Sequence, residues 1–213
     1  MLVLLDVDST LIENEVIELL AEAAGPEALA HVAEVTERAM RGELDFAESL
    51  AERLRSLKGL PESTIAAAAD EVRVTDGVAE LIEAVHAQGG TIAAVSGGFH
   101  EILDGLGERL GLDRWSANRL EIHEGTLTGR SRGPIIDSVA KAEYLEALAL
   151  ELGLPRHRTI AIGDGANDIA MMRAAGLSVS FCGKPAARAA ANICVDVPSM
   201  RELLPILRLV AHS

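Results

Sequence analysis

The stretch that decides the fold is LVLLDVDST, at residues 2–10. Four apolar residues are followed at once by Asp6 and, two positions later, by Asp8. A short apolar run that ends in polar functional residues is typical of a buried strand in a parallel sheet. We therefore expect a strand over 2–5 whose end brings two carboxylates to the same crevice.

Similar apolar runs recur along the chain and alternate with helical patterns. Further strands are expected at 91–95, 159–162 and 177–181. Helices are expected at 78–88, 101–110, 141–152 and 166–175, with a last helix at 200–210 that is broken or kinked at Pro205. Strands that alternate with helices predict an α/β fold with a doubly wound, Rossmann-like parallel sheet.

Two stretches break this alternation. Residues 14–74 contain no convincing strand and divide into three or four helices, with breaks near Gly25, Gly42 and Gly59. We expect this block to form a helical cap, inserted after the first strand of a catalytic core made of residues 1–13 and 75–213. Within the core, the stretches 120–122 and 126–128 on either side of residues 123–125 predict a β-hairpin.

Composition narrows the class of protein. The formal net charge is −14 and the basic residues are not clustered, so no nucleic acid partner is expected. No apolar run has membrane-spanning length and the start of the chain lacks the pattern of a signal peptide, which favours a cytoplasmic protein without a membrane partner. Cys182 and Cys194 are the only cysteines, and we expect two buried thiols in a reducing compartment.

Polar residues follow three of the predicted strands directly. In an open parallel sheet, ligands bind beyond the carboxyl ends of the strands, so these residues should meet in space. They are Asp6, Asp8 and Thr10 after the first strand, Ser96, Gly97 and Gly98 after the second, and Gly163, Asp164, Gly165, Asn167 and Asp168 after the third.

The residue types that converge in this way indicate a metal and a phosphate group. Asp6, Asp8 and Asp164 would repel one another without a cation, and Mg²⁺ prefers hard oxygen ligands and takes few carboxylates. Acids at strand ends are also common as turn formers and helix caps, which would explain one of them but hardly the set. The small residues at 96–98, between a strand and a helix, would let backbone N–H groups approach a phosphate, although such a sequence is also an ordinary turn.

Four motifs in this chain resemble those of the haloacid-dehalogenase superfamily, in the same order and at plausible spacing. They are DVDST at 6–10, Ser96, Lys141 and GDGAND at 163–168. Within that superfamily the resemblance is to enzymes that act on phosphoserine, and it covers nearly the whole chain. The supporting stretches are DVDSTLIENE at 6–15, DFAESLAERL at 45–54, VSGGF at 95–99, ANRLEIHEGTLTG at 117–129 and GDGANDIAMM at 163–172.

This resemblance implies an Mg²⁺-dependent phosphatase that forms an aspartyl-phosphate and hydrolyses phosphoserine in serine biosynthesis. It implies Asp6 as the nucleophile, Asp8 as the general acid and base, and Asp6, Asp164 and the backbone carbonyl of Asp8 as metal ligands. The resemblance also implies that Ser96, Gly97 and Lys141 bind the phosphate group. It implies that Glu15, Arg53 and Asn167 bind the rest of the substrate, with Met40 and Phe46 as apolar lining. Thr10 and Asp168 are implied as supporting residues.

Alternatives remain for single residues and for the whole chain. Without the resemblance, Lys141 would be a solvated surface lysine, and Arg53 would pair with Glu48 or Glu52. The chain could instead be a receiver domain phosphorylated on aspartate, although receivers are shorter, lack the helical block and lack the second acid. A further alternative keeps the chemistry and changes the substrate to another small phosphomonoester, or transfers the phosphoryl group from phosphoserine to homoserine.

Overall fold

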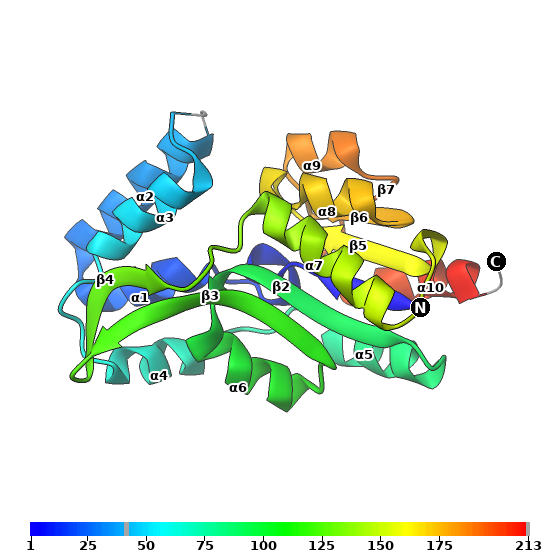
Figure 1. Cartoon of the computed structure of the whole chain (residues 1–213), viewed down its shortest axis with the longest axis horizontal. Coiled ribbons are helices and arrows are strands. Elements are labelled where there is room, and N and C mark those ends of the chain that lie inside the picture. Colours follow the sequence, from blue (N-terminus) through cyan, green and yellow to red (C-terminus); the bar gives the residue numbers. More distant parts are fainter. Residues whose placement is uncertain (41–42, 212–213) are drawn as a thin grey trace.

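The computed structural model of this chain describes residues 1–40 and 43–211. Its centre is a seven-stranded sheet in the order β4-β3-β2-β1-β5-β6-β7, with helices packed on both faces (Figure 1). The strands are β1 (Leu2–Leu5), β2 (Thr91–Phe99), β3 (Arg114–His123), β4 (Thr126–Arg132), β5 (Thr159–Gly163), β6 (Leu177–Phe181) and β7 (Ile193–Val195). The predicted α/β class with a mostly parallel, doubly wound sheet is confirmed.

The first strand lies in the middle of the sheet and contributes to two cores. β1 pairs in parallel with β2 on one side and with β5 on the other. Val3 and Leu5 belong to the larger apolar cluster, and Leu2 and Leu4 belong to the smaller one on the opposite face. All four side chains are fully buried, which explains the unbroken apolar run at the start of the chain.

Helices of the core cover both of these faces. The larger cluster is covered by α5 (Val78–Ala87), α6 (His100–Leu110) and α10 (Leu204–Ala211). The smaller cluster is covered by α7 (Ser138–Glu151) and α8 (Ile169–Ala174). A further helix, α9 (Pro185–Ala190), packs beside α8. Short helical turns are η1 (Val7–Leu11), η2 (Arg156–Arg158), η3 (Ala166–Asp168) and η4 (Met200–Leu203). The expected break near Pro205 is found one residue before it, between η4 and α10. Pro205 itself lies in the first turn of α10, where proline is tolerated because its missing N–H has no partner within the helix.

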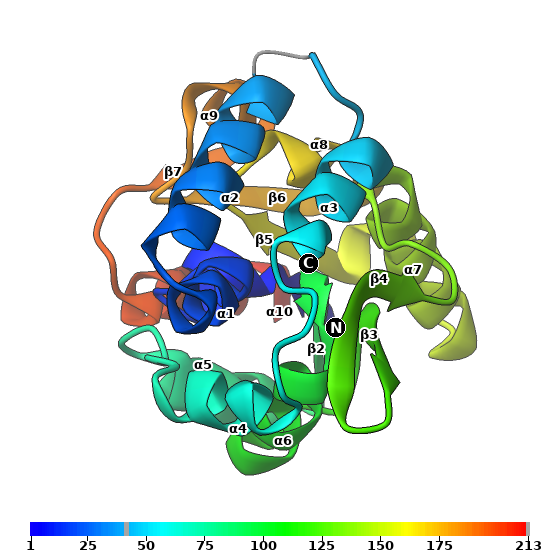
Figure 2. The ribbon, with the colours of Figure 1, turned by 90° about the vertical axis from the view of Figure 1, so that its left-hand side faces the viewer.

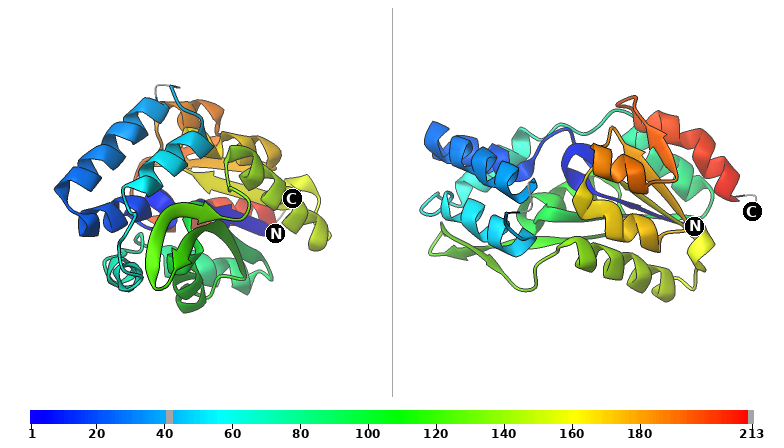
Figure 3. Two further views of the ribbon diagram at one scale, coloured as in Figure 1. Left: turned by 60° about the vertical axis from the view of Figure 1, so that its left-hand side comes forward. Right: turned by 90° about the horizontal axis from the view of Figure 1, so that it is seen from above.

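The stretch 14–74 forms four helices among the described residues, within the three or four that the sequence predicts, and the predicted break at Gly42 lies outside the described residues. They are α1 (Val16–Ala24), α2 (Pro26–Met40), α3 (Phe46–Arg55) and α4 (Ser63–Asp70). Figure 2 shows α2 and α3 side by side in front of the sheet, while α4 lies against α6. Seen from above in Figure 3, α2 and α3 occupy the end of the molecule opposite α10.

The predicted hairpin is confirmed as β3 and β4, and its tip contacts the link between α3 and α4. Leu127 pairs through its backbone with the link between α3 and α4: its N–H donates to the carbonyl of Leu60 at 2.8 Å, and its carbonyl accepts from Gly59 at 2.9 Å. The backbone N–H of Glu62 donates to the carbonyl of Gly125 at 2.8 Å. Main-chain hydrogen bonds thus join the hairpin tip to the segment that connects α3 and α4.

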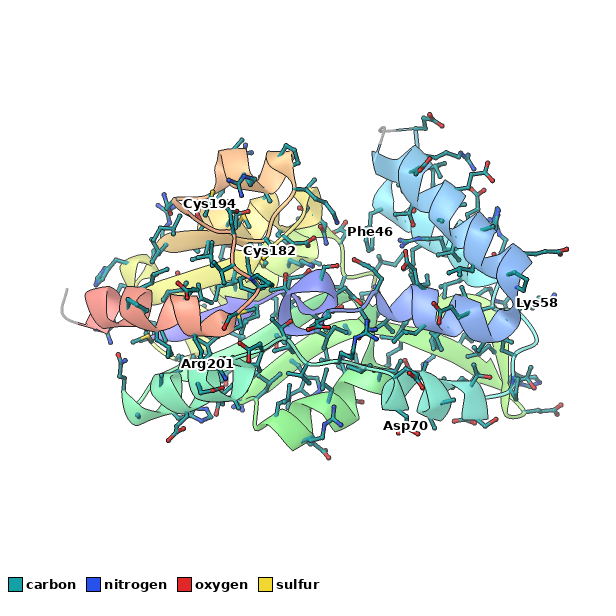
Figure 4. The ribbon with its side chains drawn as sticks, turned by 180° about the vertical axis from the view of Figure 1, so that it is seen from behind. Phe46, Lys58, Asp70, Cys182, Cys194 and Arg201 are labelled. Carbon is teal, nitrogen blue, oxygen red and sulfur yellow. The ribbon has the colours of Figure 1, made fainter. Side chains whose placement is uncertain are left out.

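Two local predictions were wrong. Residues 96–98 do not follow the second strand, since β2 continues to Phe99 and α6 begins at His100. Cys182 and Cys194 are exposed free thiols and not the buried thiols that were expected (Figure 4). Cys182 lies in the loop after β6, where its φ is 45°, and Cys194 lies on the edge strand β7. No helix in the described part of the chain has the length and apolar character to cross a membrane.

Candidate active site

A tight turn at the end of β1 brings both carboxylates to the carboxyl edge of the sheet. The N–H of Asp6 still pairs with the carbonyl of Ile162 on β5, at 2.8 Å. The chain then turns within η1, where Leu11 N–H donates back to Asp6 and Ser9 adopts a φ of 57°. As a result, Asp6 and Asp8 both line the same cavity, as their spacing predicted.

Lys141 lies directly behind Asp6 and is buried. Its Nζ is 2.5 Å from Oδ1 of Asp6 and 2.7 Å from Oδ1 of Asp168, and its side chain is only 1% exposed. α7 begins beside this point, with Asp137 accepting the N–H of Ala140 as its N-cap. The surface-lysine alternative is therefore excluded.

The burial of this group of charges shifts their protonation. Burial, followed by the neighbouring Asp168 carboxylate, raises the pKa of Asp6 well above its ordinary value, and Lys141 opposes the shift. Burial also acts to lower the pKa of Lys141, but the carboxylates of Asp168 and Asp6 outweigh it and leave that pKa raised. Lys141 therefore stays charged, and its charge favours an ionised Asp6.

Asp168 holds the turn that presents Asp164. One oxygen of Asp168 bonds Lys141, and the other accepts from the backbone N–H groups of Asp164 at 3.1 Å and Gly165 at 3.0 Å. The carboxylate of Asp164 pairs through Oδ2 with Lys184 Nζ at 3.1 Å. Lys184 also donates its backbone N–H to the carbonyl of Asp164 at 2.8 Å.

This arrangement fits a divalent metal. Asp6, Asp164 and Asp168 offer carboxylate oxygens that all lie within 4.8 Å of one another. In the described residues, both oxygens of Asp168 are hydrogen-bonded, whereas Asp6 and Asp164 each keep one oxygen without a partner. Hard, buried carboxylate oxygens are the donors that Mg²⁺ or a similar ion prefers, so Asp6 and Asp164 are the side chains best placed to bind it.

The carboxylate of Asp8 belongs to a different set of contacts. Its Oδ1 accepts from the backbone N–H of Val16 at 2.8 Å, and its Oδ2 accepts from the hydroxyl of Ser96 at 2.9 Å. Ser96 Oγ in turn accepts from the N–H of Gly98 at 2.7 Å. Phosphate binding by the Ser96 hydroxyl would therefore require it to exchange its present partner, Asp8.

Side chains from other parts of the chain lie directly against the Cα atoms of Gly97 and Gly98. A Cβ atom on Gly97 would lie 2.9 Å from Cζ of Phe46, and one on Gly98 would lie 3.0 Å from Oδ2 of Asp8. Figure 4 labels Phe46 where the cap faces the core. The buried Asn118, which the sequence analysis missed, donates to the carbonyl of Gly97 at 2.8 Å and thereby fixes this part of β2.

A cavity of about 790 Å³ opens between the cap and these residues. The predicted site residues that line it are Asp6, Asp8, Glu15, Phe46, Arg53, Gly97, Asp164 and Asn167. Lys141, Ser96, Asp168 and Thr10 are buried behind this lining, and the hydroxyl of Thr10 has no partner among the described residues. The side chain of Met40 lies outside the part of the chain whose side chains are described.

Glu15 and Arg53 face this cavity from the cap side. The hydroxyl of Ser9 donates to Glu15 at 2.7 Å, and burial together with the charge of Asp8 raises the pKa of Glu15 to about 7. Arg53 donates through Nε to the carbonyl of Ser49, and burial lowers its pKa.

Arg53 has no carboxylate partner within ion-pair distance among the described residues. The two acids that might have paired with it are otherwise engaged: Glu52 pairs with Arg38 at 2.8 Å, and Glu48 forms a capping box with Asp45 at the start of α3. A partly buried guanidinium that has free donors and lines a cavity is suited to bind the carboxylate of a ligand.

Comparison with known proteins agrees with this geometry. The sequence model of the haloacid dehalogenase-like hydrolases matches residues 3–173, and the chain belongs to that family. It is therefore an enzyme of a hydrolase family, and the receiver-domain alternative is excluded.

Several of the individual relatives and solved structures that are similar to this chain are phosphoserine phosphatases. The chain is 50% identical to a phosphoserine phosphatase of Streptomyces coelicolor over 206 residues, which is 97% of this chain and half of that protein. It is 44% identical to the phosphoserine phosphatase of Streptococcus thermophilus, over 97% of this chain and 95% of that protein. Among solved structures, a phospho-aspartyl intermediate analogue of phosphoserine phosphatase superposes with a TM-score of 0.91 at 40% identity, covering 97% of this chain and 98% of the other.

Proposed function

We propose that this enzyme is a phosphoserine phosphatase, which hydrolyses O-phosphoserine to serine and inorganic phosphate through an aspartyl-phosphate on Asp6. The observation that carries the proposal is that Arg53 and Glu15 both lie on the wall of the cavity that is also lined by Asp6. These two side chains have the charges that complement an amino-acid carboxylate and ammonium. The relatives and the superposed structure support the same substrate.

Nucleophilic attack is assigned to Asp6. Lys141 holds Oδ1 of Asp6 and orients the carboxylate; with the metal also bound through Oδ1, Oδ2 would be left free to attack phosphorus. As the bond from this oxygen to phosphorus forms, the bond from phosphorus to the serine oxygen breaks. When bound to Asp6, Asp164 and the backbone carbonyl of Asp8, Mg²⁺ would supply positive charge to the phosphate oxygens.

Proton transfer is assigned to Asp8. Protonated Asp8 gives its proton to the departing serine oxygen, and the resulting carboxylate takes a proton from the water that hydrolyses the aspartyl-phosphate. Val16 at the start of the cap and Ser96 at the end of β2 contact its two oxygens. Asp8 is thereby held at the junction of cap and core, within the lining of the cavity.

Substrate recognition is assigned to the cap, which we propose to comprise residues 14–74. Arg53 binds the α-carboxylate with its planar fork, and Glu15 accepts from the α-ammonium. Gly97 and Asn167 complete the phosphate end of the cavity, and Phe46 provides an apolar wall. The exposed free thiols of Cys182 and Cys194 support a reducing, cytoplasmic location for the enzyme.

The test is a steady-state comparison of Arg53→Ala with wild type on phosphoserine and on a simple aryl phosphate. Loss of a charge partner in a closed site costs roughly 2–5 kcal/mol. At about 1.4 kcal/mol per decade, kcat/KM for phosphoserine should fall by roughly 30- to 3,000-fold. The aryl phosphate lacks the amino-acid charges and should be affected far less.

Arg38→Ala is the matched control, because Arg38 lies on the cap and pairs with Glu52. It should leave both substrates close to wild type. Equal losses on both substrates for Arg53→Ala would show that Arg53 supports the fold or the chemistry instead. Adding homoserine to the wild-type reaction checks for phosphoryl transfer, whose product would be phosphohomoserine in place of inorganic phosphate.

A further inference from the structure

Lys184 is a second lysine at the carboxylates of the site, and the mechanism above does not use it. It is the N-cap residue of α9 and follows β6, with Pro185 as the first residue of the helix. Its ammonium lies 3.1 Å from Oδ2 of Asp164, and its side chain lines the cavity. The ion pair therefore involves one of the two carboxylates that are best placed to bind a metal.

The two lysines of the site differ in how firmly they are held. The side chain of Lys141 is 1% exposed and contacts two buried carboxylates, whereas that of Lys184 is 47% exposed and pairs with Asp164 alone. The ammonium of Lys184 reaches solvent and the four-carbon stem of lysine is flexible, whereas Asp164 itself is buried. Lys184 can therefore leave Asp164 when another cation takes over the neutralisation of that carboxylate, while Lys141 is enclosed between Asp6 and Asp168.

The charges around the cavity indicate when Lys184 would leave. Six carboxylates lie in or directly behind the lining, namely Asp6, Asp8, Glu15, Glu18, Asp164 and Asp168, and three cations face them, namely Lys141, Lys184 and Arg53. The carboxylates outnumber the cations, so the site has an excess of negative charge that a bound divalent cation would reduce. A cation bound to Asp164 would lie a few ångströms from the Lys184 ammonium and repel it.

We propose that Lys184 is a mobile counter-ion, which neutralises Asp164 in the metal-free site and turns to the phosphate group of the ligand once a divalent cation is bound. The proposal rests on the proposed function, because the phosphate is that of the substrate or the product. Its physical consequence is coupling: the metal displaces the ammonium from Asp164 and makes it available to the phosphate, so each ligand favours the other.

Two calorimetric titrations test this proposal on the purified full chain. In the first, Mg²⁺ is titrated without phosphate into wild type, Lys184→Met and Lys184→Gln. Both variants lack the competing charge, so we expect them to bind Mg²⁺ roughly two- to fivefold more tightly. In the second, inorganic phosphate is titrated at saturating Mg²⁺, and we expect both variants to bind it roughly tenfold more weakly.

Lys58→Met is the matched control, because Lys58 is an exposed lysine in the link between α3 and α4 and its loss changes the net charge equally. It should match wild type in both titrations. Weaker Mg²⁺ binding in the Lys184 variants would overturn the proposal, since Lys184 would then orient Asp164 as a ligand. Unchanged phosphate binding would overturn it as well. If wild type did not hydrolyse phosphoserine, the proposed function would fail while both titrations could still be interpreted.

Discussion

The ammonium of Lys141 lies 2.5 Å from the carboxylate of Asp6, although 135 residues separate them in the chain. Both side chains are almost fully buried, and the same ammonium contacts Asp168. This contact joins the first strand to a helix of the second half of the core. It also leaves two carboxylates that depend on a single cation for neutralisation.

We expect Lys141→Met to destabilise the metal-free protein by roughly 3–5 kcal/mol, because removal of one partner leaves buried charge without compensation. Added Mg²⁺ should recover part of this loss by supplying charge to Asp6. Urea unfolding with and without Mg²⁺ measures both effects, with Lys58→Met as the control for charge. A loss below about 1 kcal/mol would show that the buried pair contributes no more than a surface pair.

Asp8→Asn should retain the fold and lose turnover. An amide at this position can still accept from Val16 or Ser96, but it can neither give a proton to the serine oxygen nor take one from water. General acid–base catalysis contributes about 10²–10⁴-fold, so kcat should fall by that factor. Steady-state assays alongside circular dichroism give the comparison, and a reduction of less than roughly tenfold would remove this role from Asp8.

Glu15→Gln should stabilise the metal-free protein above neutral pH while impairing catalysis. The pKa of Glu15 is raised from 4.5 to about 7, so the folded state binds the proton more tightly than the unfolded state does. Wild-type stability is therefore lost as pH rises from about 4.5 to about 7, and the glutamine variant does not have this loss. At pH 8 the free energy of unfolding of Glu15→Gln should exceed that of wild type by about 2–3 kcal/mol, and this difference should vanish below pH ~4.5.

The matched control for that variant is Glu22→Gln, which removes an exposed carboxylate from α1, the helix that Glu15 directly precedes. Urea unfolding at several pH values should show no comparable pH-dependent gain for Glu22→Gln. If the difference in free energy of unfolding between Glu15→Gln and wild type stayed constant from about pH 4 to about pH 8, the raised pKa of Glu15 would not be the cause of the higher stability.

Removal of divalent cations should abolish hydrolysis, and Mg²⁺ should restore it. Ca²⁺ should restore it poorly, because it accepts more ligands at longer distances and would misplace Asp6 relative to phosphorus. The experiment is an assay after exhaustive chelation, followed by titration with each ion. Full activity in the chelated enzyme would contradict the assignment of Asp6 and Asp164 as metal ligands.

The convergence of polar residues at strand ends could be predicted from the sequence because it follows from parallel pairing alone. Asp6 and Asp164 lie together since β1 and β5 are neighbours in register. The same rule applied to the fourth predicted strand, at 177–181, would have found Lys184, three residues beyond its end. That residue was missed because the rule was applied to three strands only.

Other features depend on contacts that no local pattern contains. The two glycines after Ser96 favour a turn in isolation, yet they lie in an extended strand. They are needed there because Phe46 and Asp8, both remote in the chain, leave no room for a Cβ. Similarly, β7 has only three residues and too little length for a periodic signal.

The central place of β1 has a consequence for synthesis on the ribosome. The first strand to be made has β2 as one neighbour, but its other neighbour, β5, begins only at Thr159. Until that residue has left the ribosome, one edge of an entirely apolar strand has no partner, and such edges pair readily with other chains. Nascent chains stopped between residues 100 and 158 should therefore depend on chaperones far more than chains released after β5.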